Sequence, residues 1–77
     1  MASPNEINWD DVRLFLSVLR AASLRASSQQ LGLSRPTVAR RLTGLENKLG
    51  VVLFDRRPDG LHVTPAGAAL RPRAEAV

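Results

Sequence analysis

The amino-acid sequence predicts a single, mostly helical domain with one β-hairpin in its C-terminal third. Apolar residues recur every three or four positions at residues 9–19 and again at residues 38–49, which is the period of amphipathic helices. A β-prone run at residues 51–54 is then followed by turn residues, including Pro58 and Gly60. With 77 residues, the chain has room for one domain and a compact core.

The first predicted helix spans about residues 9–21. Asn8 can cap its start, and Asp10 and Asp11 lie in the first turn, where the helix dipole favours negative charge. Its apolar residues at helical spacing are Trp9, Val12, Phe15, Leu16 and Leu19. Aromatic side chains could stack on nucleic-acid bases, but in an apolar stripe they far more often belong to the core. We therefore predict that Trp9 and Phe15 are core residues.

A second, shorter helix is predicted from Leu24 to Leu31, with Ser23 as its cap and Gly32 as its stop. Its middle holds small side chains, Ala26, Ser27 and Ser28, which would let another helix approach closely. The three-residue connection that follows begins with glycine, as in the corner of a helix-turn-helix motif.

The third predicted helix lies between the cap Ser34 and the stop Gly50, and its two faces differ. The apolar stripe consists of Val38, Leu42, Leu45 and Leu49, which we assign to the core. The opposite face carries Pro36, Arg40, Thr43, Gly44 and Asn47, with Thr37 and Arg41 on one flank and Arg35 in the first turn. This outer face is basic and bears hydroxyl groups, whereas Glu46 points toward the edge of the apolar side.

The hairpin is predicted to pair residues 51–54 with residues 61–63 across a turn at residues 55–60. Thr64 and Pro65 then supply a cap and a first helical position, so a fourth helix runs toward Val77. We expect Pro72 to kink or interrupt this helix, and expect the helix to have nothing to bury it. The order of elements predicts a winged helix-turn-helix: a three-helix core, a hairpin wing and the start of a C-terminal helix.

The charge of the chain favours an anionic partner. Its formal net charge is +4, and ten of its eleven cations are arginine, which binds phosphates and guanine edges bidentately. On charge alone, a merely soluble basic surface is an equally good interpretation. The absence of cysteine excludes disulfides and thiolate metal sites, and we expect a cytoplasmic protein because neither a membrane span nor a signal peptide is evident.

No catalytic or metal-binding pattern is found in the sequence. His62, the sole histidine, has no cysteine or carboxylate at ligand spacing, so a solvent-facing strand residue is the better interpretation. There is no nucleophile triad and no glycine-rich phosphate loop. We therefore expect neither an enzyme nor a cofactor.

The run at residues 23–67, SLRASSQQLGLSRPTVARRLTGLENKLGVVLFDRRPDGLHVTPAG, resembles the N-terminal DNA-binding domain of LysR-type transcriptional regulators. Its segments LSRPTVARRLTGLE, LGVVLFDR and LHVTPAG follow that family's order and spacing, and residues 8–19 resemble its first helix. The resemblance implies that the third helix lies in the major groove of double-stranded DNA and that the wing meets the flanking backbone or minor groove. It also implies a homodimer formed through the fourth, linker helix, and a further C-terminal domain that senses a small-molecule effector.

The resemblance also implies a set of DNA-binding residues. Ser34, Arg35, Pro36, Thr37 and Arg40 fall at the family's recognition positions, and Arg56 and Arg57 fall on its wing. The sequence departs from the family pattern in two ways: Arg35 stands where glutamine is common, and Ser27-Ser28 replace a usual alanine pair. The first departure changes which base would be preferred, so operator rules should not be transferred.

Physical chemistry supports the same residues. Arg35 and Arg40 can pair with guanine, Pro36 and the Thr37 methyl group can touch a thymine methyl, and Arg41 with the Ser34 and Thr37 hydroxyls suits phosphate. Ser23, Arg25 and Thr43 complete the candidate surface.

These assignments divide the chain into three parts. Residues 1–6 are expected to be a flexible lead, and residues 7–64 the DNA-binding unit, with the helix-turn-helix at about residues 24–43. Residues 65–77 are expected to be a truncated linker helix. The alternative function is a winged-helix module that uses the same face to bind an acidic partner protein.

Overall fold

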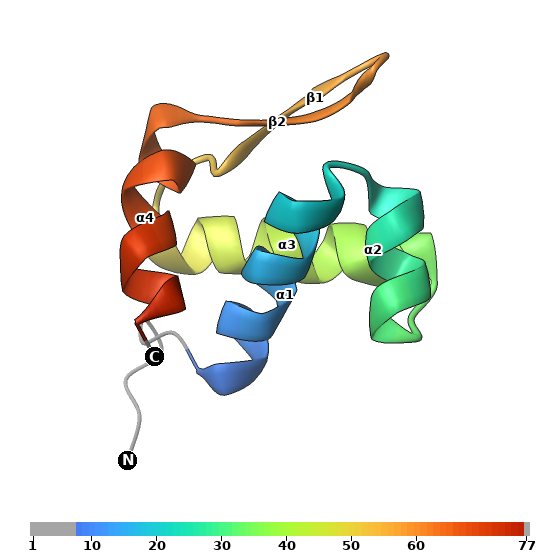
Figure 1. Ribbon diagram of the computed structural model, residues 1–77, viewed down its shortest axis with the longest axis horizontal. Helices are drawn as coiled ribbons and strands as arrows, with labels where there is room; N and C mark the ends of the chain where they lie inside the picture. The colour runs from blue at the N-terminus through green and yellow to red at the C-terminus, as the bar shows by residue number, and fades with distance from the viewer. Residues whose placement is uncertain (1–7, 77) are drawn as a thin grey trace.

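A computed structural model describes residues 8–76, so the predicted lead at residues 1–6 lies outside the described residues. The elements follow the predicted order, helix, helix, turn, helix, hairpin and helix (Figure 1). They are α1 (Trp9–Ala21), α2 (Leu24–Leu31), α3 (Arg35–Leu49), β1 (Phe54–Arg57), β2 (Gly60–Val63) and α4 (Pro65–Glu75). The winged helix-turn-helix fold is therefore confirmed.

The helix ends lie where the capping residues predict them. The Asn8 side chain accepts a hydrogen bond from the Asp11 amide at 2.9 Å, and the Asp11 carboxylate accepts from the Asn8 amide at 3.2 Å. Ser23, Ser34 and Thr64 cap α2, α3 and α4 in the same manner. These bonds satisfy amides that have no partner within the first turn of a helix, so each start is fixed locally.

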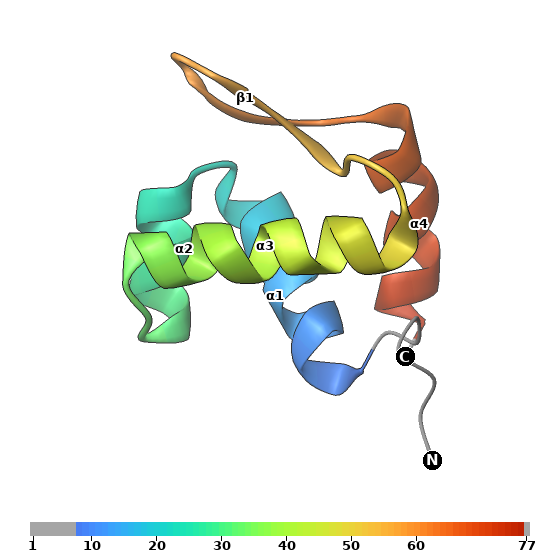
Figure 2. The same ribbon diagram turned by 180° about the vertical axis from the view of Figure 1, so that it is seen from behind.

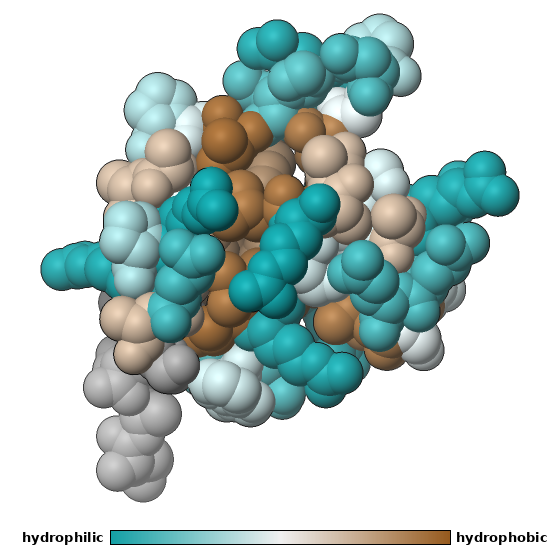
Figure 3. Space-filling view, viewed as in Figure 1, coloured by the Kyte–Doolittle hydropathy of each residue, from teal (hydrophilic) through white to brown (hydrophobic). Residues whose placement is uncertain are grey.

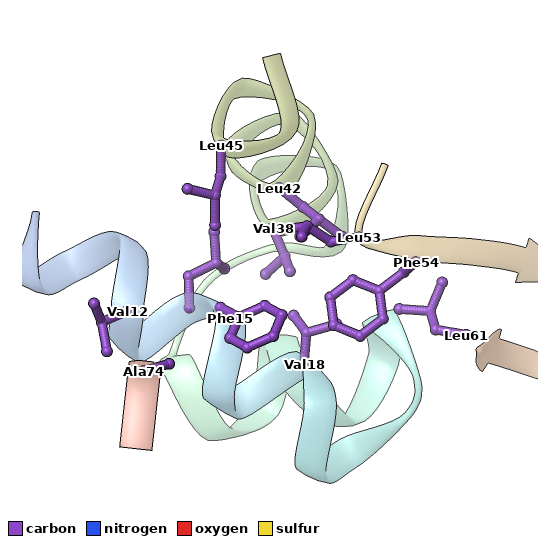
Figure 4. Packing of buried hydrophobic residues seen from close by; sticks show 11 residues of the cluster. Val12, Phe15, Val18, Val38, Leu42, Leu45, Leu53, Phe54, Leu61 and Ala74 are labelled. Carbon is purple, nitrogen blue, oxygen red and sulfur yellow. The ribbon is translucent and has the colours of Figure 1, made fainter. Parts of the chain in front are cut away.

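The core lies between α1 and α3, which form opposite layers of the molecule (Figures 1 and 2). Val38, Leu42 and Leu45 point from α3 toward Phe15 of α1, as the apolar stripe predicts (Figure 4). The wing completes this core, since the ring centroids of Phe15 and Phe54 are 5.6 Å apart. The wing is thereby packed onto the helices.

The assignment of Trp9 to the core is wrong, because its side chain is 63% exposed. Trp9 is the first residue of α1, and although α4 packs near this end of the helix, the Trp9 side chain stays on the surface. The buried face of α1 instead includes Leu14 and Val18, which are 4% and 0% exposed. The prediction for Phe15 is confirmed.

The predicted limits of the hairpin are also wrong. Residues 55–57, assigned to the turn, belong to β1, and the loop consists of Pro58 and Asp59 alone. Val51 and Val52, assigned to the first strand, lie outside it and are 42% and 58% exposed. The outer half of the hairpin stands clear of the core, so pairing with β2, and not side-chain burial, decides which residues are extended.

The wing is attached to the turn between α1 and α2. The amide of Leu61 donates to the carbonyl of Ala22 at 2.9 Å, and Ala22 itself has a left-handed conformation with φ 56°. Gly60 has φ 131°, as the turn prediction requires, and a Cβ there would lie 2.8 Å from the same carbonyl. Glycine at position 60 therefore permits the close approach that ties β2 to the helices.

α4 continues through Pro72 to Glu75, so the expected interruption does not occur. The helix does have a partner to bury it, since it packs against α1 and β2, and Ala74 lies in the core. Proline removes only one hydrogen-bond donor from this short helix, and the contacts of Gly67 and Ala74 hold the turns on either side of it. No helix within residues 8–76 is long and apolar enough to cross a membrane.

Candidate nucleic-acid interface

The outer face of α3 is exposed, as its sequence predicts. Arg35, Pro36, Arg40, Arg41 and Thr43 all lie on the surface. At its start, the Ser34 hydroxyl accepts from the Thr37 amide at 3.3 Å and donates to the Thr37 hydroxyl at 2.8 Å. The hydroxyl hydrogen of Ser34 is thus used within the cap, whereas Thr37 keeps its own hydrogen for a further acceptor.

The two wing arginines point to opposite faces of the hairpin. Arg56 pairs in register with the buried Leu61, so its side chain is on the face that looks toward the helices. Its guanidinium donates to the Thr43 hydroxyl of α3 at 3.5 Å. Arg57 lies on the other face, with its Nη2 atom 3.6 Å from the Asp55 carboxylate. Of the two wing arginines, Arg56 is therefore the one linked to α3.

An open groove brings six of the predicted residues together. It runs between the starts of α2 and α3 and the wing, and the predicted residues that line it are Ser23, Arg25, Arg35, Pro36, Arg56 and Arg57. The other residues that line it carry no charge: they are Leu24, Ala39, Gly60 and Leu61. Four arginines around a groove with no carboxylate in its lining make a site suited to a polyanion.

The other predicted residues lie beside this groove. Thr43 is joined to the wing through Arg56, and Arg40 is exposed on the outer face of α3. Arg41 lies apart, on the flank that faces α1, where it shares a smaller hollow with Asp10 and Arg13. Figure 2 shows the wing running alongside α3, so both elements can meet one extended ligand. Hydrophilic side chains cover the outer end of the wing (Figure 3).

His62 is only partly exposed, and it has a partner that the sequence did not indicate. Its Nε2 atom lies 2.8 Å from the Asp59 carboxylate at the tip of the wing. This hydrogen bond lowers the pKa of Asp59 below its ordinary value, against a smaller opposing effect of burial. Within the residues that the structure describes, no three histidine, cysteine or acidic side chains lie close enough to hold a metal ion.

Sequence reasoning missed the role of Glu46. Its carboxylate oxygen Oε2 accepts hydrogen bonds from the amides of Leu53 at 2.7 Å and Phe54 at 3.3 Å. The position of Glu46 at the edge of the apolar stripe was a signal that its side chain turns inward. The strand that it meets could not be identified without the fold.

These features define a winged helix-turn-helix with one basic face, built from α2, α3 and the wing. The family model described as "Bacterial regulatory helix-turn-helix protein, lysR family" matches residues 9–68, which is most of the chain. The chain belongs to this family.

The relatives and solved structures agree with this assignment. The chain is 40% identical over 63 residues to the HTH-type transcriptional regulator TfdS of Cupriavidus pinatubonensis, a match that covers 82% of this chain and 21% of that protein. It is similar to the CbnR_DBD–DNA complex, with a TM-score of 0.86, 31% identity and coverage of 91% of this chain and 80% of that one. A LysR-family regulator from Eggerthella lenta has a TM-score of 0.81 and 32% identity, and the match covers 90% and 99% of the two chains.

The chain spans about a fifth of the length of curated relatives such as TfdS and the Escherichia coli regulator TdcA. These relatives are named as transcriptional regulators.

Proposed function

We propose that this chain binds double-stranded DNA as the DNA-binding domain of a LysR-type transcriptional regulator. α3 enters the major groove with Arg35 and Arg40 directed at base edges, and the wing brings Arg56 and Arg57 to the flanking backbone or minor groove. Ser34, Pro36, Thr37 and Arg41 complete the contacts of α3, and Ser23, Arg25 and Thr43 lie at their margin.

One observation carries this proposal: four arginines from α2, α3 and the wing surround a single open groove whose lining contains no carboxylate. A helix fits the major groove of B-form DNA, and arginines beside it can contact phosphates on either side. The solved complex of the CbnR DNA-binding domain with DNA supports the same use of this fold.

The proposal extends to the parts of the chain and to the longer protein. Residues 7–64 form the DNA-binding unit, with the helix-turn-helix at about residues 24–43, and residues 65–77 begin a linker helix through which two copies pair. A small-molecule effector would bind in a separate C-terminal domain. The proposal assigns the chain no catalytic role and places its action in the cytoplasm, where bacterial DNA lies.

A titration with a random-sequence duplex tests this proposal. Binding measured by fluorescence anisotropy should be tight at low salt and weaken at moderate salt, because arginines that replace phosphate counterions give a negative slope of log K against log salt. Arg20→Ala is a matched control, since Arg20 is exposed on α1 beside a hollow that contains none of the proposed contacts. This variant should bind as the unchanged chain does.

A different result would favour the second candidate function, an acidic partner protein bound by the same arginines. Absence of DNA binding at low salt, together with binding of an acidic peptide such as polyglutamate, would overturn the DNA-binding proposal.

A further inference from the structure

Glu46 joins α3 to the start of the wing through two hydrogen bonds. Its Oε2 atom accepts from the amides of Leu53 and Phe54, at 2.7 and 3.3 Å. Leu53 is fully buried, so water cannot reach its amide, and the carboxylate supplies the partner that this donor needs. Glu46 therefore holds the backbone of the chain where it enters β1.

The same segment is held from its other side by Thr64, the cap of α4. The Thr64 amide donates to the carbonyl of Leu53 at 2.9 Å, and its hydroxyl donates to the carbonyl of Val52 at 2.5 Å. Residues 52–54 thus lie between α3 and the start of α4, with polar contacts to both. Of these contacts, only those of Glu46 connect the segment to the helix that carries the arginines.

A second contact between α3 and β1 lies one helical turn earlier. Thr43 accepts from Arg56 at 3.5 Å, so Glu46 meets the strand at Phe54 and Thr43 meets it two residues farther on. The strand therefore runs back along α3, from its C-terminal half toward its N-terminal arginines (Figure 2). The position of Arg56 over α3 depends on where Phe54 is held.

We propose that Glu46 is a positioning residue that fixes the wing over α3 and so sets the reach of Arg56 relative to Arg35 and Arg40. This inference rests on the proposed DNA-binding function. Glu46 itself touches no DNA; it acts through the backbone of β1. DNA contacts by the wing and by α3 are then made together, because one side chain sets the spacing between them.

Two substitutions separate this role from an effect of charge. Glu46→Gln and Glu46→Ala remove the same negative charge, but only glutamine keeps an oxygen that can accept from the Leu53 amide. Any difference between these two variants therefore reports the hydrogen bonds. Circular dichroism checks that each variant is folded, and Glu46→Asp, whose carboxylate is one methylene shorter, replaces Glu46→Ala if that variant unfolds.

The first measurement needs no DNA. Amide hydrogen exchange and ¹⁵N relaxation should show that Glu46→Gln keeps the protection of the Leu53 amide and the rigidity of Arg56 and Arg57. Glu46→Ala should reduce the protection of the Leu53 amide at least tenfold and make the backbone of the wing more mobile. Equal protection and equal mobility in both variants would overturn the proposal.

The second measurement is the salt dependence of binding to a random duplex. Glu46→Ala should reduce the magnitude of the negative slope of log K against log salt by about one, as Arg56→Ala should. The double variant should show the same reduction as each single variant, because both changes remove the same phosphate contact. Glu46→Gln should keep the slope of the unchanged chain. Additive losses in the double variant would overturn the proposal.

These two measurements also separate the inference from the proposed function. If the unchanged chain fails to bind DNA, the DNA-binding function is wrong, and so is any part for Glu46 in DNA contact. The exchange and relaxation data then decide whether Glu46 still fixes the wing.

Discussion

At the scale of single residues, the three arginines in the first half of α3 have different surroundings. Arg35 lines the groove beside the wing, whereas Arg41 lies on the flank toward α1, with Asp10 nearby. Arg40 is exposed between these two flanks. We therefore propose Arg40 for base contact in the middle of the DNA-binding surface, and Arg41 for a phosphate at its border.

Arg40→Ala should weaken binding to a preferred duplex, selected from a random pool by the unchanged chain, by roughly 1–3 kcal/mol, the value of a bidentate arginine–guanine pair. Binding to random duplex should change much less, and the circular dichroism spectrum should stay the same because the side chain is exposed. Arg20→Ala serves as the control. Unchanged affinity for the preferred duplex would exclude Arg40 from base contact.

At the tip of the wing, the Asp59–His62 pair should make the pKa of Asp59 depend on His62. The hydrogen bond from His62 lowers the pKa of Asp59 below 3.8. A carboxyl group with a lowered pKa stabilises the folded state above its ordinary pKa, and that contribution is lost as the pH falls through the lowered value. His62→Ala should return the pKa of Asp59 toward 3.8 in a carboxyl ¹³C titration. The same Asp59 titration in both proteins would contradict this assignment.

At the scale of elements, hydrogen bonds hold the backbone of the wing at three places along its length. Glu46 holds the entry to β1, Ala22 accepts from Leu61 of β2, and Thr64 joins the base of the wing to α4. The wing is therefore supported by α3, by the corner between α1 and α2, and by α4. The outer end, at Pro58 and Asp59, is the part without such support.

Two helical glycines test the close packing of α4 under the wing. A Cβ at Gly67 would collide with the Leu53 carbonyl and lie 2.7 Å from Val63 Cγ2, whereas a Cβ at Gly44 would meet nothing within 4 Å. Gly67→Ala should therefore destabilise the fold by about 1–3 kcal/mol. Gly44→Ala should stabilise it by about 1 kcal/mol through helix propensity. Chemical denaturation measures both, and equal effects would contradict the packing described for α4.

At the scale of the whole molecule, Leu53 connects the helix-turn-helix to the two elements that lie outside it, the wing and α4. Its side chain is fully buried, its amide bonds to α3 and its carbonyl bonds to the start of α4. The core is therefore shared between the three helices, the wing and α4. Loss of this residue should affect the entire domain, and not the wing alone.

Leu53→Ala should cost about 2–5 kcal/mol of unfolding free energy, the usual range for a buried leucine. A domain of this size has only about 4–11 kcal/mol in total, so a large part of the stability would be lost. Val52→Ala is the matched control. The Val52 side chain, next to Leu53 in the chain, is 58% exposed, so this substitution should change the free energy of unfolding by about 0.5 kcal/mol or less. Thermal unfolding followed by the resonances of residues in the helices and in the wing should show a single transition at a lower temperature. A separate transition of the wing would contradict a core shared by the whole domain.

The helices and their limits could be predicted because capping residues and apolar spacing are local signals. Asn8, Ser23, Ser34 and Thr64 all cap the helices that they precede. The exposure of Trp9 could not be predicted, because it depends on which elements cover one end of α1. The continuation of α4 through Pro72 likewise depends on its packing against α1.

The candidate site was only partly predictable for the same reason. The exposure of Arg35 and Arg40 on the outer face of α3 follows from the helical period, and six of the predicted residues line one groove, whereas Arg41 lies apart on the flank toward α1. The contacts of Glu46 and Thr43 with β1 join residues 8 and 13 positions apart, brought together by the fold. Sequence spacing cannot specify such contacts.

We propose that one surface of the molecule, made of α3 and the wing, binds DNA. The most direct test is a titration of the ¹⁵N-labelled chain with a random-sequence duplex at low salt, followed by amide resonances. The largest shifts are predicted at residues 34–41 and at Arg56 and Arg57, and they should diminish as salt is raised. Shifts confined to the outward face of α1, or no shifts at low salt, would contradict the claim.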